Sequence, residues 1–402
     1  MSIIYYLLYI SSIYDKMLSD IPSIMSLTRK YAYARLKKGN KLHLEKRFHM
    51  KFVHIADVHL GMQPDLGYSW SEARKRELYE TFFRAIDFCK EQDVDLLLIA
   101  GDLFHRQPNR QELAEVFYAL TKLNKTKVVF IAGNHDYMGP GSLYETEKWP
   151  TNVKVLQKEN VETYHIEELN TYIYGYSYET QDVKENRIQN IRPLNKEGYH
   201  ILLAHGGDES NNPLNRKELV DTPFDYVALG HIHKPERIGA RAAYPGSLEP
   251  LDKTETGAHG FILGTLGERG CYLQFINFAK RHYEQLIIEA EPGMTLYALR
   301  DKLQELIYEQ GKENIYKILL EGIVSGQLLL EKEVLYSVGN IVEVVDRTKP
   351  DYDYEKLSYE NRDNIIGMYI DSIRDMDLSD EEKDLALYYG IKAFTDSKIK
   401  ER

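Results

Sequence analysis

Residues able to bind a metal follow five apolar runs of the sequence. The runs are FVHIADVH (52–59), LLLIAGD (96–102), VVFIAGNHD (128–136), ILLAHGG (201–207) and YVALGHIH (226–233). The candidate ligands that they carry are Asp57, His59, Asp102, Asn134, His205, His231 and His233. A structural zinc site needs only four ligands and usually some sulfur. Two carboxylates, a carboxamide and four imidazoles instead suit two adjacent cations.

Mixed nitrogen and oxygen donors favour Mn²⁺, Fe²⁺ or Zn²⁺ over Ca²⁺ and Mg²⁺, and we expect Mn²⁺. Two such ions, roughly 3.5 to 4 Å apart, can clamp a phosphate and activate water for in-line attack. In DVH and HIH the two donors are two residues apart, and an extended backbone would turn both to one face. The plain structural alternative is a set of satisfied core histidines and helix-capping aspartates.

The runs that carry these donors are typical of strands buried on both faces. Between the first three runs, apolar residues recur at helical spacing. They are Leu78, Phe82, Ile86 and Cys89, then Leu113, Phe117, Leu120 and Leu123. Alternating strands and helices predict a layered α/β fold. In such folds ligands bind beyond the carboxyl ends of the strands, which is where the donors fall.

Taken together and in order, DVH, GDLFH, GNHD, AHGG and GHIH resemble the calcineurin-like metallophosphoesterases, and among them the SbcD-type DNA-repair exonucleases. The resemblance covers about residues 50–280 well. It implies β-sheets flanked by helices, with a small α+β capping domain and a helical tail. It also implies that Asp57, His59, Asp102 and His233 hold one metal. Asp102, Asn134, His205 and His231 would then hold the other, with Asp102 bridging.

The same resemblance implies three catalytic residues outside the ligand set. His135 would stabilise the transition state or protonate the leaving oxygen, a task that suits an imidazole near neutral pH. Asp136 would orient His135, although it could equally cap a following helix. His105 resembles an additional histidine of the nuclease members, with an ordinary surface residue as the alternative. His54 lies within the first strand, and we expect it to belong to the core.

Basic residues stand just beyond two of the ligand motifs. They are Arg106 and Arg110 after Asp102, and Lys234, Arg237 and Arg241 after His233. Cationic side chains supply most non-specific affinity for DNA, so these residues could contact phosphates. A solvated loop explains them equally well.

Beyond about residue 280 the sequence predicts helices and strands but offers no further candidate catalytic or metal-binding residues. The capping domain is expected over residues 281–348, with a helix through Leu296, Leu299, Leu303 and Leu306 and strands in YKILLEGIV and GNIVEVVD. RTKPDYDYEK (347–356) is expected to be a linker. Two helices follow in the tail, residues 349–402, and Ser379 with Glu382 predicts a capping box for the second. By resemblance, this tail would bind an SbcC-like coiled-coil ATPase.

Composition limits the setting and the partners. The 402 residues carry a net charge of −11, so the overall field does not attract nucleic acid. Cys89 and Cys271 lack any Cys-x-x-Cys spacing, which favours a reducing, cytoplasmic location. Residues 1–49 are basic but lack a cleavage site and a membrane-spanning stretch. We expect Met50 to be the true start, with a membrane-surface or partner-binding leader as the alternative.

The residues therefore predict a two-metal phosphoester hydrolase, and the resemblance implies that it cleaves DNA phosphodiesters in repair and recombination, with exonuclease and endonuclease action. It would be the D subunit of an SbcCD-like complex, with DNA and the ATPase as partners and no membrane contact. A homodimer is expected from the family alone. Two alternatives stay open: a phosphoesterase acting on small phosphodiesters or phosphoproteins, and a non-catalytic adaptor of the ATPase.

Overall fold

The computed structural model describes residues 49–209, 211–324 and 333–400, with side chains described to residue 394. The prediction for residues 1–49 thus lies, apart from His49, outside the described residues. Within the described ranges, no helix combines the length and the apolar character needed to cross a membrane.

The first sheet has six strands in the order β12-β11-β1-β2-β3-β4. Its strands are β1 (Met50–Ile55), β2 (Leu96–Ala100), β3 (Lys127–Ile131), β4 (Val153–Val155), β11 (Gly260–Gly267) and β12 (Gly270–Asn277). Strands β1 to β4 are parallel, whereas β11 pairs antiparallel with β1 and β12. The first three predicted strands are therefore neighbours, and their carboxyl ends share one edge.

The second sheet also has six strands, in the order β5-β6-β7-β8-β10-β9. Its strands are β5 (Glu162–Ile166), β6 (Thr171–Gly175), β7 (Tyr199–His205), β8 (Tyr226–Gly230), β9 (Glu236–Ile238) and β10 (Ala242–Tyr244). β7 and β8, which are the last two predicted strands, are parallel neighbours at its centre.

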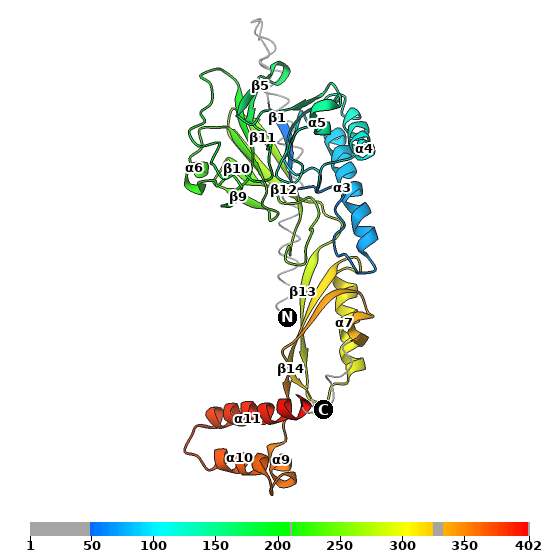
Figure 1. Ribbon diagram of the computed structural model, residues 1–402, viewed down its shortest axis with the longest axis vertical. Coiled ribbons are helices and arrows are strands. Elements are labelled where there is room, and N and C mark those ends of the chain that lie inside the picture. The colour runs from blue at the N-terminus through cyan, green and yellow to red at the C-terminus, as the bar shows by residue number, and fades with distance from the viewer. Residues whose placement is uncertain (1–48, 210, 325–332, 401–402) are drawn as a thin grey trace, which may run out of the picture. The chain divides into compact units, whose positions relative to one another are not determined.

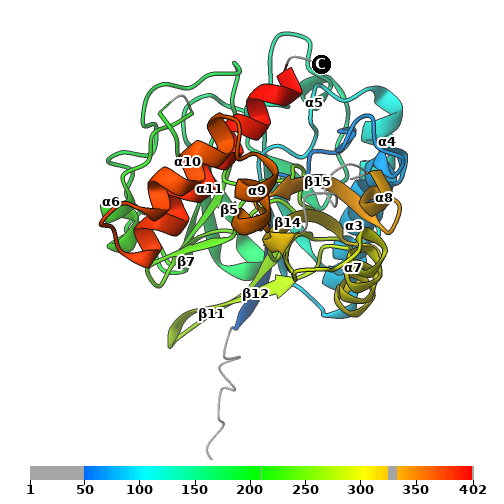
Figure 2. The same cartoon turned by 90° about the horizontal axis from the view of Figure 1, so that it is seen from below.

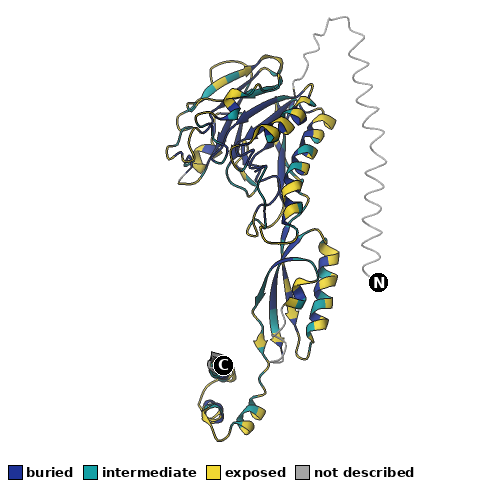
Figure 3. Cartoon of the chain, turned by 45° about the vertical axis from the view of Figure 1, so that its right-hand side comes forward, coloured by how far each residue is buried: buried dark blue, intermediate teal, exposed yellow. Residues whose placement is uncertain are grey.

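The two sheets pack face to face. Phe52 and Leu98 of the first sheet share a buried cluster with Ile201 and Tyr226 of the second, and the Phe52 and Tyr226 rings are 4.7 Å apart. The strands of both sheets are mostly buried (Figure 3). Such burial on both faces explains why the runs show no polar alternation.

Helices cover the outer face of the first sheet (Figure 1). α3 (Ser71–Glu91) and α4 (Arg110–Thr121) pack on it through Leu78, Phe82 and Leu113, as the helical spacing predicts. α4 begins with a capping box between Asn109 and Glu112, and it ends before the buried Leu123. The short helices α5 (Leu143–Thr146), 3₁₀ helix η1 (Glu167–Leu169) and α6 (Arg216–Val220) lie in connections. The α/β fold class is confirmed.

A third, smaller sheet follows. It consists of β13 (Tyr283–Ala290), β14 (Ile315–Val324) and β15 (Asn340–Asp346), with β16 (Lys349–Pro350) pairing with the end of β14. α7 (Leu296–Gln310) packs on it through Leu299, Leu303 and Ile307, and α8 (Glu333–Tyr336) through Leu335. We call residues 283–346 the capping unit. Its helix and two of its strands agree with the sequence prediction.

Three helices form the tail: α9 (Tyr354–Glu360), α10 (Ile365–Arg374) and α11 (Asp380–Lys400). α10 and α11 lie side by side and bury Ile370, Ile373, Leu387 and Ile391 between them (Figure 2). The Ser379–Glu382 capping box is present. The predicted linker 347–356 connects β15 to α9, but it contains the two-residue strand β16, and α9 already begins at Tyr354, where Asp353 caps the helix.

Candidate metal centre

The donor-bearing ends of the two sheets meet. Nδ1 of His205, at the end of β7, donates to the carbonyl oxygen of Ala100, at the end of β2, over 2.9 Å. Gly230 ends β8 so close to β2 that a Cβ there would lie 1.9 Å from the Ala100 oxygen. Glycine at this position therefore allows the strand ends of the two sheets to approach.

The backbone turns sharply at four of the seven predicted ligands. Asp57, His59, Asp102 and His231 have φ values of 51°, 50°, 50° and 97°. Left-handed backbone is uncommon outside glycine, and it concentrates at functional sites. The expectation that extended backbone turns Asp57 and His59 to one face was wrong. Left-handed turns after β1 direct them instead, with Asp57 N and His59 N bonded to the carbonyls of Gly101 and Asp102.

One group of donors gathers around Asn134. Its Oδ1 lies 2.9 Å from Nε2 of His205 and 3.1 Å from Nδ1 of His231. Asp102 is adjacent, with Oδ2 3.4 Å from Nε2 of His205. The structure thus brings together the four residues expected to hold one of the metals.

A second group gathers around His59. Its Nε2 lies 3.1 Å from Nε2 of His233 and 3.7 Å from Oδ2 of Asp102. Asp57, His59 and His233 have donor atoms all within 4.8 Å of one another, and so do Asp57, Asp102 and His205. Asp102 lies next to both groups, as a bridging carboxylate would.

In three of these histidines, a hydrogen-bond acceptor contacts the outer ring nitrogen, which is the one that points away from the other donors. Nδ1 of His205 faces the Ala100 carbonyl, Nε2 of His231 is 2.5 Å from Oδ2 of Asp208, and Nδ1 of His233 is 2.7 Å from Oε1 of Glu255. Carbonyl and carboxylate oxygens only accept, so these nitrogens carry the protons. The remaining nitrogen of each ring is then the one that can offer a lone pair toward the centre once it loses its proton.

His135 lies beside the second group with its ring fixed. Its Nδ1 donates to the carbonyl oxygen of His105 over 3.1 Å, and its backbone N–H donates to Oδ1 of Asp102 over 2.9 Å. Nε2 of His135 is therefore the ring atom left for a substrate. The His105 ring stacks on the His135 ring, with 4.8 Å between the ring centroids. Nδ1 of His105 lies 3.2 Å from Nδ1 of His59.

Asp136 holds the loop and not the His135 ring. Its buried carboxylate accepts from the backbone N–H groups of Gly133 and Phe104 and from the Tyr144 hydroxyl. Burial and the nearby Asp102 charge raise the pKa of Asp136 to about 7. Among the described contacts, the orienting partner of the His135 ring is the His105 carbonyl.

Burial and neighbouring charged groups also shift the pKa values of Asp102, His205 and His233. Burial raises the pKa of Asp102, but the His205 and His59 imidazoles outweigh it and hold that pKa well below its usual range. Burial lowers the pKa of His233, but Glu255 and Asp57 reverse the effect and raise it to about 9. Asp102 and Asp57 similarly raise the pKa of His205 to about 9. By contrast, burial lowers the pKa values of His59 and His231 and raises that of Asp57, so the neutral forms of these three groups are favoured in the metal-free protein.

These residues fit a pair of divalent cations. His59 and His233 direct their Nε2 atoms at each other, and Nδ1 of each ring already has a partner. Two lone pairs held 3.1 Å apart repel unless a proton or a cation lies between them. Gly133 leaves the space for Asp102, because a Cβ there would lie 2.2 Å from Oδ1 of Asp102. The nitrogen and oxygen donor set suits first-row transition metals.

The basic residues near the rim are mostly paired. Arg106 forms a bidentate ion pair with Glu112, and Arg110 pairs with Glu147. Arg237 donates to the Gly239 and Ala240 carbonyls, and Arg241 to the Phe224 carbonyl. A phosphate would have to compete with these partners.

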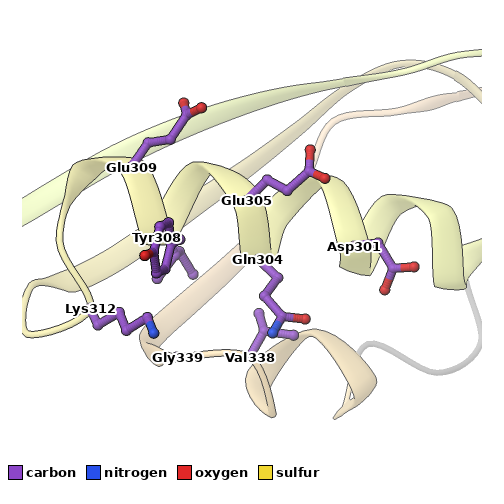
Figure 4. Close-up of a pocket in the computed structure, with 9 residues that line it drawn as sticks. Asp301, Gln304, Glu305, Tyr308, Glu309, Lys312, Val338 and Gly339 are labelled. Atoms are coloured by element: carbon purple, nitrogen blue, oxygen red, sulfur yellow. The ribbon is translucent and has the colours of Figure 1, made fainter.

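A hollow of about 630 Å³ lies on the capping unit, apart from the metal ligands (Figure 4). Asp301, Glu305 and Tyr308 of α7 line it together with Lys312 and Gly339. It contains none of the predicted site residues, so it is not the candidate centre.

Sequence reasoning missed Asp208 and Glu255. Asp208 follows the AHGG run directly, and this nearness was the available signal. Glu255 lies 22 residues beyond His233 in a loop without a motif, so its contact appears only in three dimensions. His54 is a core residue as expected, fully buried with Nδ1 2.8 Å from the Tyr226 hydroxyl.

Comparison with known proteins identifies several similar sequences. Similar proteins include the uncharacterized metallophosphoesterase YhaO of Bacillus subtilis, 27% identical over 304 residues, covering 70% of this chain and 74% of that protein. The DNA double-strand break repair protein Mre11 of Methanocaldococcus jannaschii is 34% identical, over 51% of this chain and 58% of its own length. Mre11 of Methanopyrus kandleri is 31% identical, over 53% of each chain.

The chain thus spans little more than half the length of these two Mre11 proteins. A crystal structure of a dimetal phosphatase from Danio rerio aligns with 57% of this chain and 99% of its own, at 13% identity and a TM-score of 0.34. Residues 50–235 match the family described as calcineurin-like phosphoesterase. The segment 50–235, which carries all seven predicted ligands, is therefore similar to the calcineurin-like phosphoesterases.

Proposed function

We propose that this protein is a two-metal nuclease that hydrolyses DNA phosphodiester bonds. The observation that carries the proposal is the convergence of the seven donors, from the ends of β1, β2, β3, β7 and β8, into two adjacent groups that share Asp102. Asp57, His59, Asp102 and His233 would hold one divalent ion, and Asp102, Asn134, His205 and His231 the other. We take Mn²⁺ as the ion, one of the first-row metals that suit mixed nitrogen and oxygen donors.

The bound ions would act as Lewis acids that stabilise charge on the phosphate. They would also lower the pKa of a bound water to about 7. The chain contributes fixed geometry, because acceptors already hold the outer nitrogens of His205, His231 and His233. Buried ligands with preset rings need little reorganisation when charge develops on the phosphate.

His135 is the proposed acid. Since its Nδ1 proton is engaged by the His105 carbonyl, the protonated ring would deliver the Nε2 proton to the leaving alkoxide oxygen. Stacking of His105 on this ring would limit its rotation. We assign His105 a positioning role, and we assign Asp136 the support of the loop that carries Asn134 and His135.

Two observations support DNA as the substrate and an ATPase as the partner. The Mre11 relatives are named for double-strand break repair. The tail exposes apolar side chains, among them Ile365, Met368, Leu385 and Tyr389. An SbcC-like coiled-coil ATPase that covers them would make this chain the D subunit of an SbcCD-like complex. The free Cys89 and Cys271 fit a reducing, cytoplasmic location.

The test is digestion of linear duplex and single-stranded DNA with Mn²⁺, with wild type beside His135→Ser, and with and without the ATPase. We expect wild type to cleave and His135→Ser to lose cleavage while its metal content stays at the wild-type value, because His135 is not a proposed ligand. Loss of metal in the variant would refute the assigned role.

The same experiment separates the alternatives. Rapid cleavage of a chromogenic diester with intact duplex would indicate a phosphoesterase of small substrates or phosphoproteins. Binding of the ATPase with neither substrate cleaved would indicate an adaptor. Cleavage of DNA by the isolated chain rules out both.

A further inference from the structure

Glu255 fixes the ring of His233. Its Oε1 lies 2.7 Å from Nδ1 of His233, and both side chains are more than two-thirds buried. Because a carboxylate accepts, Nδ1 is the donor and Nε2 is turned toward His59, 3.1 Å away. A carboxylate on the outer nitrogen of a ligand histidine sets both the tautomer and the ring orientation.

The Glu255 carboxylate is itself held in place. Its Oε2 accepts from the backbone N–H of Leu251 over 2.9 Å and from the Ser247 hydroxyl over 3.3 Å. The backbone N–H of Glu255 donates to the Asp252 carbonyl, and Nε2 of the buried His259 lies 3.2 Å from the Glu255 carbonyl. Since both carboxylate oxygens are engaged, Glu255 can impose its position on His233.

The loop that carries Glu255 also meets the capping unit. Thr256 forms a β-bridge with Tyr283, at the start of β13, and the Gly257 carbonyl lies 2.9 Å from Nδ1 of His282. Lys253 pairs with Glu343 of β15 over 3.2 Å. A hollow of about 220 Å³, lined by residues of this loop and of β13 to β15, lies at the junction. Residues 251–257 therefore link His233 to the capping unit.

We propose that Glu255 is the positioning residue for His233 and that residues 251–257 make metal binding at His233 depend on the capping unit. The inference rests on the proposed two-metal site. A shift of the capping unit would move Thr256 and Glu255 together, and it would turn the His233 ring relative to Asp57 and His59.

The experiment is Mn²⁺ titration of the metal-free full chain by calorimetry, for wild type, Glu255→Ala and Glu255→Gln. We expect Glu255→Ala to weaken one of two sites by about 10- to 100-fold and to leave the other unchanged. Glu255→Gln keeps a neutral acceptor for Nδ1 of His233. Its Mn²⁺ affinity should lie between those of wild type and Glu255→Ala, because charge-assisted hydrogen bonds are about twice as strong as neutral ones. Glu284→Gln is the matched control, since this carboxylate lines the same junction without a described contact to a proposed ligand.

A second variant tests the link to the capping unit. Lys253→Gln breaks the pair with Glu343 without touching Glu255 and leaves the Lys317–Glu343 pair in place, and we expect about two- to fivefold weaker binding at the same site, which matches the loss of an exposed ion pair. Binding equal to wild type would overturn the link, and equal binding by both Glu255 variants would overturn the positioning role. If wild type binds two ions and cleaves DNA, either result leaves the proposed function standing. If wild type binds none, both fail together.

Discussion

Gly133 provides the space that the Asp102 carboxylate occupies. A Cβ at position 133 would lie 2.2 Å from Oδ1 and 2.7 Å from the backbone nitrogen of Asp102. We expect Gly133→Ala to displace Asp102 and lower the Mn²⁺-supported cleavage rate by about 100-fold or more, since a shift near 1 Å can cost that much. Initial rates on linear DNA, with the metal content of each protein, measure the effect.

Gly139→Ala is the control for that substitution. It lies six residues further on, where the nearest atom to a new Cβ belongs to the Tyr137 ring, 3.0 Å away, and not to a proposed ligand. The control should cleave at close to the wild-type rate. Wild-type activity in Gly133→Ala would mean that Asp102 tolerates displacement and does not bridge the two ions.

Protons compete with metal for His233 and His205. The pKa of each is raised to about 9 in metal-free protein, because Glu255, Asp57 and Asp102 outweigh the effect of burial. Both rings are thus protonated at pH 7, and a cation must displace protons. We expect Mn²⁺ affinity to rise with pH up to about 9, by about tenfold per pH unit for each proton released. Calorimetric titrations across this range measure it, and an affinity independent of pH would contradict it.

At the scale of elements, a buried ion cluster joins α3 to the start of the capping unit. Arg74 of α3 is fully buried and pairs with Glu77 and Glu249, and Arg281, just before β13, also pairs with Glu77. Burial raises the pKa of Glu77, but Arg281 and Arg74 outweigh it and the net pKa is lowered. Glu77 therefore stabilises the fold above its ordinary pKa of 4.5, and this stabilisation is lost as pH falls below it.

We expect Arg74→Met to lower the free energy of unfolding by about 3 to 5 kcal/mol, because Glu249 would stay buried without its cation. Urea denaturation measures the change. The control is Arg216→Met, which breaks the exposed pair with Glu236 and should cost less than about 1 kcal/mol. Equal decreases in the free energy of unfolding in the two variants would show that the buried ion cluster stabilises the fold no more than an exposed ion pair does.

The sequence predicted these elements unevenly, for physical reasons. Strands β1, β2, β3, β7 and β8 were predictable because central strands form continuous apolar runs. β12 is an edge strand with mixed exposure, and β4, β9 and β10 have three residues each, so they carry little local signal. The contact of Glu255 with His233 depends on tertiary packing, and the left-handed turns at Asp57 and His59 depend on neighbouring strands. Neither is encoded in local spacing.

At the scale of the whole molecule, the net charge of the chain differs in character from the residues of the proposed metal centre. The chain carries −11 overall, whereas the proposed centre concentrates four histidines around buried carboxylates. Attraction of DNA would then depend on bound cations and local contacts more than on the overall field. An ATPase partner that supplies DNA affinity would complement a nuclease of this kind.

The tail is the surface that we propose for such a partner. Leu385 and Tyr389 of α11 are 55% and 62% exposed, although the opposite side of the helix packs on α10 through Leu387 and Ile391. We expect Leu385→Glu to abolish co-elution with the coiled-coil ATPase, because a charge replaces an apolar contact. Mn²⁺-supported cleavage by the isolated chain should not change, since none of the tail residues that the structure describes belongs to the metal groups. Tyr272→Glu, at a 68% exposed position of β12, is the matched control and should still co-elute. Co-elution of the Leu385 variant at wild-type levels would place the partner elsewhere on the chain.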